Sequence, residues 1–284
     1  MQITALLGDY PAGAALKSGA VRPEGLEVAF REGAPARHFR GFLERLDTDI
    51  SEIAIMTHLI GHEAGVDSAL LPAVVLTRAQ HPYLVHDPAR GLTGPEGLAG
   101  KRVVIRSWTV TTATWIREVL DRDHGVPADS IEWITLEEPH LAGFRNPPNL
   151  RRAPAGSTPE GLLAAGEAEA AVLGAVPTEG PLVSLIPQPE AAGADWAARE
   201  GAIMINHMIA VPRAFAAKHP EAVRAYLAAL AESDARTPPG KPRFVLGRAA
   251  IEPSLKRAIA CAGRQGILTG PVTPDTLYAG NGLD

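Results

Sequence analysis

The stretch that decides the fold is Val103–Leu120, VVIRSWTVTTATWIREVL. A β-branched run at its start predicts a buried strand, and apolar side chains at helical spacing fill its second half. Arg106, Ser107, Thr111 and Thr112 lie between the two parts. A helix that begins here has unpaired backbone N–H groups and a positive dipole end, so this turn predicts a seat for a small anion. The alternative is that the threonines cap the helix and Arg106 pairs with a surface acid.

The composition limits the classes of partner. The chain has 284 residues, 46% of them hydrophobic, and a formal charge of −5. This charge gives no electrostatic reason to expect nucleic acid or an anionic membrane. No apolar run approaches the roughly 20 residues of a membrane span, and the start MQITALLGDY lacks the regions of a secretory signal. We therefore expect a cytoplasmic protein, or a periplasmic or extracellular one if a signal peptide has been removed.

Metal and cofactor motifs are missing from the sequence. Cys261 is the only cysteine, so no intrachain disulfide can form. His58 and His62 are four residues apart, but no acidic residue is spaced to complete a metal site with them. The sequence has no nucleophile elbow, Walker loop or G-x-G-x-x-G fingerprint. We expect neither a metal nor an organic cofactor.

Predicted strands alternate with predicted helices along the chain, which indicates an α/β fold with parallel strands. The Pro- and Arg-rich residues 144–157 are typical of a mobile surface loop. In open α/β sheets, ligands bind at the carboxyl ends of strands. The candidate residues at predicted strand ends are Asp9, Thr57, His58, Arg106, Ser107 and the loop 137–140, which includes Glu138.

Two histidines are candidates for proton transfer. Asn206 and His207 interrupt the apolar run 203–211, where a buried imidazole must be hydrogen-bonded. His207 is therefore either a proton donor that faces a cleft or a core histidine bonded to backbone carbonyls. His81 follows another buried strand and has the same two interpretations, as a proton donor or as a turn residue before Pro82. Glu137 and Glu138 are a catalytic acid pair, a hinge contact or part of a solvated loop.

Several segments carry a family resemblance. GPEGLAGKRVVI (94–105), followed by a Ser/Thr-rich helix start, resembles the type II periplasmic-binding-protein fold. LLGDY, SGAVRPEGLEVAF, WITLEEP, INHMIAVPRAFAAKHPEAVRAYLAAL and RQGI are similar to segments of the 4,5-dihydroxyphthalate decarboxylase family. The resemblance implies two lobes, each a mostly parallel sheet flanked by helices, with a ligand cleft between them. We expect one lobe to comprise residues 1–90 plus 205–284 and the other 103–200, with crossings near 85–102 and 200–206.

The same resemblance implies a cofactor-independent decarboxylase of a hydroxylated aromatic carboxylate. His207 would be the acid, with His81 as second choice. Arg106, Ser107, Thr111 and Thr112 would bind the carboxylate; Asp9, Thr57, His58, Glu138 and Asn206 would complete the substrate site. The alternative is a non-catalytic solute-binding protein of the ABC-transporter type for a small carboxylate. Either would bind a small anionic aromatic ligand, and either could form a homo-oligomer.

Overall fold

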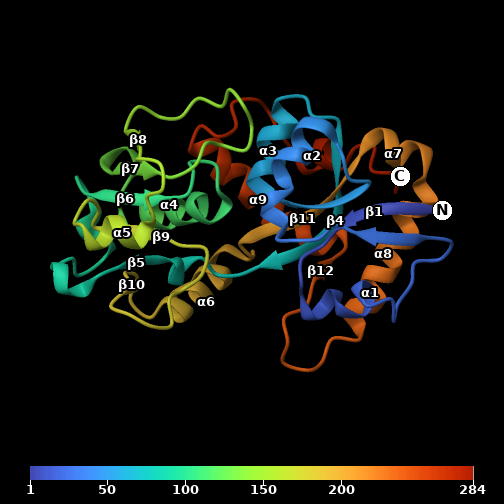
Figure 1. Ribbon diagram of the computed structural model, residues 1–284, viewed down its shortest axis with the longest axis horizontal. Coiled ribbons are helices and arrows are strands. Elements are labelled where there is room, and N and C mark those ends of the chain that lie inside the picture. The colour runs from blue at the N-terminus through green and yellow to red at the C-terminus, as the bar shows by residue number, and fades with distance from the viewer. Residues whose placement is uncertain (284) are drawn as a thin grey trace. The chain divides into compact units, whose positions relative to one another are not determined.

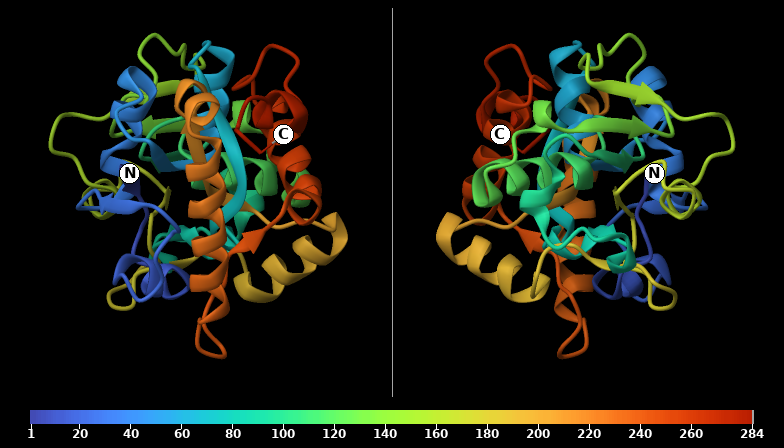
Figure 2. Two further views of the ribbon diagram at one scale, coloured as in Figure 1. Left: turned by 90° about the vertical axis from the view of Figure 1, so that its right-hand side faces the viewer. Right: turned by 90° about the vertical axis from the view of Figure 1, so that its left-hand side faces the viewer.

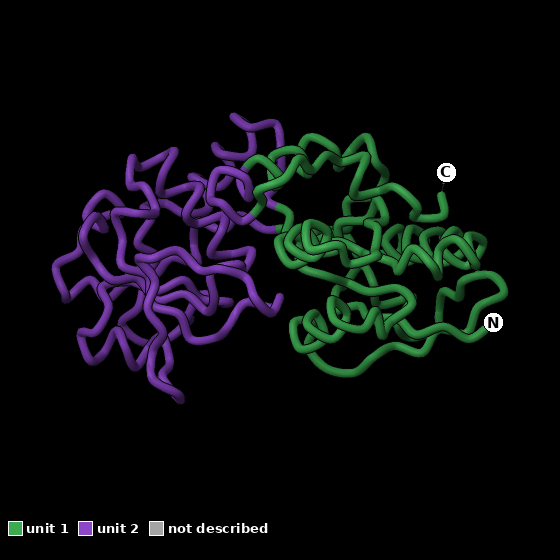
Figure 3. Tube along the Cα trace, turned by 90° about the horizontal axis from the view of Figure 1, so that it is seen from above, with its two compact units in different colours: residues 1–77, 205–260, 268–284 green, residues 78–204, 261–267 purple. Residues whose placement is uncertain are grey.

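The computed structural model describes residues 1–283, which form two compact units (Figure 3). Unit 1 comprises Met1–Thr77, Ile205–Ala260 and the segment that begins at Leu268, and unit 2 comprises Arg78–Met204 and Cys261–Ile267. The chain therefore leaves unit 1 after Thr77, earlier than the expected crossing at 85–102. Residues 78–90, which we expected in the first lobe, belong to unit 2 because β5 (Leu84–His86) is a strand of its sheet. The chain returns between Met204 and Ile205.

Unit 1 is built on a six-stranded mixed sheet. Its strands, in spatial order, are β12 (Val245–Leu246), β4 (Ser68–Thr77), β11 (Ile205–Pro212), β3 (Ile50–Ala54), β1 (Gln2–Leu6) and β2 (Glu27–Phe30). β1 is parallel to β2 and β3, whereas β11 is antiparallel to both β3 and β4, and β12 is antiparallel to β4. The chain leaves the unit along β4 and returns along β11, so these long neighbours run in opposite directions. The sheet is mixed rather than mostly parallel for this reason.

Unit 1 also contains helices. They are α1 (Ala14–Lys17), α2 (Phe39–Arg45), α3 (Ile55–Glu63), α7 (Arg213–Lys218), α8 (Pro220–Ala235), α9 (Arg248–Arg264) and α10 (Pro274–Tyr278). Figure 2 shows α8 as a long orange helix. Its side chains Val223, Tyr226 and Leu230 join the same core as Ile3 and Val211. α9 begins at Arg248 and holds Pro253 inside it, and its last four residues, 261–264, belong to unit 2.

Unit 2 has a second six-stranded mixed sheet. In spatial order its strands are β10 (Val183–Ser184), β5, β9 (Ala170–Val172), β6 (Arg102–Ile105), β7 (Glu132–Thr135) and β8 (Leu150–Arg152). β9, β6, β7 and β8 run parallel, and β5 is antiparallel to β9 and β10. The helices are α4 (Thr111–His124), α5 (Pro159–Ala164) and α6 (Pro189–Glu200), and Figure 1 shows α4 and α5 beside the parallel strands. β8 corrects the prediction that 144–157 is entirely loop, since Leu150–Arg152 pairs with β7.

Within residues 1–283, none of the helices has both the length and the hydrophobicity needed to cross a bilayer.

Candidate functional site

A fully buried carboxylate, Glu52 of β3, is the centre of a polar cluster in unit 1. Its Oε1 accepts hydrogen bonds from the Tyr10 hydroxyl at 2.6 Å and from His207 Nδ1 at 2.5 Å. Its Oε2 accepts the backbone N–H of Gly8 at 2.6 Å. The His207 side chain is 18% exposed, whereas that of Glu52 is 0% exposed. One edge of the imidazole is therefore fixed by a buried carboxylate while part of the ring remains open to solvent.

The strand register brings Glu52 and His207 together. In the antiparallel pair of β11 and β3, His207 lies opposite Ala54, and Ile209 lies opposite Glu52. Residues two positions apart on a strand point to the same face, so His207 and Glu52 are diagonal neighbours on one face of the sheet. The Phe39 ring meets the imidazole edge-on, with the ring centroids 5.2 Å apart. The imidazole is thus held by a carboxylate and by an aromatic ring.

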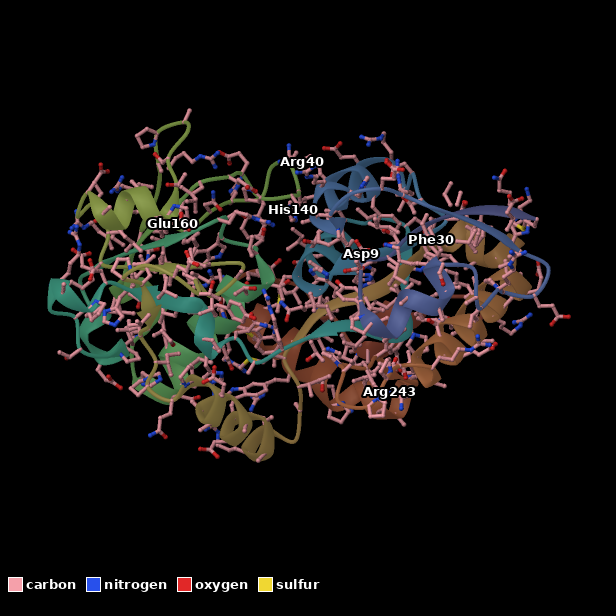
Figure 4. All side chains as sticks on the ribbon, turned by 60° about the horizontal axis from the view of Figure 1, so that its bottom comes forward. Asp9, Phe30, Arg40, His140, Glu160 and Arg243 are labelled. Atoms are coloured by element: carbon pink, nitrogen blue, oxygen red, sulfur yellow. The ribbon has the colours of Figure 1, made fainter. Side chains whose placement is uncertain are left out.

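Gly8 lets the turn after β1 reach this carboxylate. A Cβ built at Gly8 would lie 2.8 Å from carbon atoms of the Tyr10 ring, closer than real Cβ contacts allow. Glycine is therefore needed for the Tyr10 ring to fold back over its own turn. Asp9, at the tip, is exposed and forms an ion pair with Lys17 (Figure 4). The predicted ligand contact of Asp9 stays a prediction.

Tyr226 of α8 lies near this cluster in the core. Among the described residues its hydroxyl has no hydrogen-bond partner. Burial raises the pKa of Tyr226 well above its ordinary value, and the charge of Glu52 raises it further. The phenol therefore stays neutral and adds no second negative charge beside Glu52.

Thr57 and His58 lie elsewhere than the sequence suggested. β3 ends at Ala54 and α3 begins at Ile55, so both residues are in the first turns of the helix and not at a strand end. Both are buried, and neither nitrogen of His58 has a hydrogen-bond partner in the described part of the chain. Burial lowers the pKa of His58 to about 3, with His62 and Arg213 as smaller causes. This histidine is neutral at physiological pH. Asn206 is buried in β11 beside His207.

Arg106 lies at the carboxyl end of β6 in unit 2, as predicted. Its Nε is 3.3 Å from Glu137 Oε2, and its Nη2 is 3.5 Å from His140 Nε2. The guanidinium lines a cavity of about 510 Å³ together with Leu136 and Glu137, which follow β7, and Leu173, which follows β9. The ends of three adjacent parallel strands therefore meet at this cavity. Arg106 has an acidic partner, as the simpler interpretation predicted, and it also faces a space that could hold a ligand.

The hydroxyls of the turn are separate from this cavity. Val110 is the N-cap of α4 and its side chain makes no capping bond, so the predicted threonine cap is not formed. Ser107, Thr111 and Thr112 are buried, and none of the three lines the Arg106 cavity. The structure thus places Arg106 and Ser107 directly after β6, whereas Thr111 and Thr112 are the first residues of α4. Their shared role as an anion seat remains a prediction.

His81 and Glu138 differ sharply in environment. His81 begins a 3-10 turn (His81–Tyr83) and is buried, with no partner for either nitrogen among the described residues. Burial lowers the pKa of His81 to about 4. Glu138 is exposed and lies 3.4 Å from an Arg152 nitrogen. No group of three or more His, Cys, Asp or Glu side chains within residues 1–283 is arranged to hold a metal.

Comparison with known proteins gives no matching family model but two relatives. The chain is 26% identical over 239 residues to a 4,5-dihydroxyphthalate decarboxylase of Comamonas testosteroni, covering 78% of this chain and 71% of that protein. It is 26% identical over 215 residues to the enzyme of the same name from Pseudomonas putida, covering 69% and 81%. These matches confirm the resemblance that the sequence segments indicated.

Solved structures confirm the type II periplasmic-binding-protein-like fold. The alkanesulfonate-binding protein SsuA of Xanthomonas axonopodis pv. citri, bound to MOPS, superposes with a TM-score of 0.59 at 12% identity, covering 95% of this chain and 94% of that one. A periplasmic sulfonate-binding protein of Methylobacillus flagellatus gives 0.57 at 12% identity, covering 98% and 91%. The aliphatic sulphonate-binding protein SsuA of Escherichia coli gives 0.50 at 13% identity, covering 99% and 81%.

Proposed function

We propose that this protein is a cofactor-independent decarboxylase of a hydroxylated aromatic carboxylate, with 4,5-dihydroxyphthalate as the first substrate to test. The two relatives named as decarboxylases support the reaction class. The observation that carries the proposal is the 2.5 Å hydrogen bond between the buried Glu52 carboxylate and the partly exposed imidazole of His207. A carboxylate that binds Nδ1 stabilises the imidazolium and leaves Nε2 to exchange a proton.

The proposed reaction needs one proton donor. A ring hydroxyl para to the carboxylate pushes electron density onto the carbon that bears the carboxylate. His207 donates its proton to that carbon, the bond to the carboxylate breaks, and its electron pair returns to the ring as CO₂ leaves. Solvent then reprotonates His207. Glu52 keeps the imidazole in one orientation throughout.

The other candidate residues take supporting roles in the proposal. Arg106 would bind a carboxylate group, because a guanidinium fork matches its two oxygens. Ser107, Thr111 and Thr112 remain candidates for further donors to it. Asp9 or Glu138, both exposed, would accept a hydrogen bond from a ring hydroxyl. His81 ranks below His207 as the acid, because burial keeps its imidazole neutral and a neutral imidazole is a poor proton donor.

The alternative is a binding protein that closes on a small carboxylate without chemistry. The Arg106 cavity in unit 2 would serve this role as well, since a ligand carboxylate could replace Glu137 as the partner of Arg106. His207 would then be a ligand contact only. The two functions differ in whether CO₂ is released.

The test is incubation of the protein with a panel of hydroxylated aryl carboxylates while CO₂ release is measured. We expect turnover of at least one compound and a loss of about 100-fold or more in kcat for His207→Gln. His124→Gln is the matched control, because His124 also bonds a glutamate (Glu96, 2.7 Å) and its side chain is 17% exposed. Wild-type turnover by His207→Gln would refute the assignment. Thermal stabilisation by these compounds without CO₂ release would favour the binding protein.

A further inference from the structure

A buried arginine in the middle of α4, Arg117, has no acidic partner among residues 1–283. The Arg117 guanidinium stacks on the Trp108 ring, 3.7 Å from its centroid. Its Nε donates to Gln265 Oε1 at 2.7 Å, and its Nη2 donates to the Trp108 carbonyl at 2.8 Å and to Thr114 Oγ1 at 3.1 Å. Its Nη1 is buried and has no hydrogen-bond partner among the described residues. The two N–H groups of Nη1 therefore donate no hydrogen bond within the described residues.

The neighbouring acid does not neutralise Arg117. Glu118 is bound by Arg264 through a short ion pair, and Arg122 lies 3.8 Å from it. Burial lowers the pKa of Arg117 to about 9, so the guanidinium still carries its charge at neutral pH. A buried charge without a counterion is unfavourable, and the contact with Trp108 offsets only part of that. An anion beside Arg117 would supply the counterion that residues 1–283 do not.

A cavity of about 320 Å³ lies beside this arginine, entirely within unit 2. Arg117, Trp108, Pro127 and Ala128 are among the residues that line it. The volume is near the lower end of the range for small-molecule sites, about 300–1,000 Å³. Glu118 and Arg264, which pair with each other, also line the cavity. The exposed Asp121 and Asp129 line it too, and they would repel a second negative charge on a ligand. The cavity therefore fits a small molecule with one anionic group and an apolar part.

We propose that this cavity is a binding site for a small monocarboxylate, with the carboxylate beside the Arg117 guanidinium and the apolar part of the ligand against Trp108 and Pro127. None of these residues belongs to the Glu52–His207 cluster or lines the Arg106 cavity, so the site is separate from the proposed decarboxylation. Arg117 and Trp108 supply charge and an aromatic face together, which favours benzoate over acetate.

The test is isothermal titration of benzoate into variants that all carry Arg106→Met, which removes the other candidate carboxylate contact. We expect this parent to bind one benzoate and to bind the neutral isostere benzamide at least about 10-fold more weakly, because a charge-assisted hydrogen bond is lost. Added Arg117→Met should weaken benzoate binding by about 10-fold or more. The control, Arg151→Met, removes a partly exposed arginine of β8 that pairs with Glu132 and should leave binding unchanged.

A second variant protects the test against misfolding of Arg117→Met. Ala128→Leu keeps Arg117 and fills part of the cavity, so it should also weaken benzoate binding by about 10-fold or more, whereas the exposed substitution Ala165→Leu should not. Near-UV circular dichroism reports whether each variant retains its tertiary packing. The proposal is wrong if the parent shows no saturable benzoate binding, if benzamide binds equally well, or if a folded Ala128→Leu variant binds like the parent.

Discussion

Glu52→Gln tests whether a buried charge holds His207. Glu52 accepts hydrogen bonds from the Gly8 N–H and the Tyr10 hydroxyl at 2.6 Å each, and from His207 Nδ1 at 2.5 Å. A hydrogen bond to a charged group contributes about 1 kcal/mol more to stability than one to a neutral group. Three such bonds lose the charge of their common acceptor in the variant. We therefore expect Glu52→Gln to lower the free energy of unfolding by about 3 kcal/mol.

The amide also places a donor where the carboxylate has an acceptor. If the amide oxygen stays on the Gly8 N–H, the NH₂ group faces the Tyr10 hydroxyl and His207 Nδ1. The hydroxyl can rotate and accept, but Nδ1 can accept only when the ring proton is on Nε2. We expect neutral His207 to change from the Nδ1–H tautomer to the Nε2–H tautomer in the variant. The stability change and the tautomer change are separate consequences of one carboxylate.

Urea unfolding measures the first effect, and two-dimensional ¹⁵N NMR of the histidine ring nitrogens measures the second. The control is Glu96→Gln. Glu96 bonds His124 at 2.7 Å, but its side chain is 66% exposed, so its removal should change stability by less than about 1 kcal/mol. If Glu52→Gln is as mild as this control and His207 keeps its proton on Nδ1, the account of the cluster is wrong.

Two further predictions concern unit 1. Gly8→Ala puts a Cβ 2.8 Å from the Tyr10 ring and should lower the unfolding free energy by about 1–3 kcal/mol. The control is Gly174→Ala, whose added Cβ meets nothing within 4 Å and should leave the unfolding free energy unchanged. Equal urea midpoints for the two variants would contradict the prediction. His58 has a pKa of about 3 when folded and about 6.5 when unfolded. The unfolded state therefore takes up its proton first, and up to about 5 kcal/mol of stability is lost as pH falls from 6.5 towards 3. His58→Leu should show a shallower fall in unfolding free energy between pH 6.5 and 4.5; an unchanged slope would exclude this role.

The fold could be predicted from the sequence where local patterns decide it. A β-branched run and helical spacing predicted β6 and α4 close to their observed bounds. The relative direction of neighbouring strands was harder to predict, because side chains alternate with a period of two in parallel and antiparallel strands alike. β8 was missed because three residues, Leu150–Arg152, are too short to show a period, and only pairing with β7 makes them a strand.

The sequence pointed to one of the two central residues of the proposed site. It made His207 a candidate because a polar residue interrupts an apolar strand, and Glu52 in ISEIA gives the same signal in β3. A glutamate in a strand is ordinarily assigned to the solvent face of the alternation, whereas every residue of β3 is buried. Elements distant in sequence bury this face of β3, so the local sequence pattern does not predict that Glu52 is buried. Arg106 and Glu137 were foreseen at one sheet edge, because the ends of parallel strands meet there.

The proposed site depends on the strand direction that the sequence did not reveal. His207 and Glu52 meet because β11 returns antiparallel to β3 with His207 opposite Ala54, which puts the carboxylate two residues away on the same face. A shift of one residue in this register would turn His207 to the other face of the sheet and leave Glu52 buried without it. The irregular register between β11 and β4 lies at Ile205–Ile209, beside His207, while the pairing with β3 is regular from His207 to Ala210. The regular pairing of β11 with β3 therefore fixes the position of the imidazole, and the register shifts of β11 occur only in its pairing with β4.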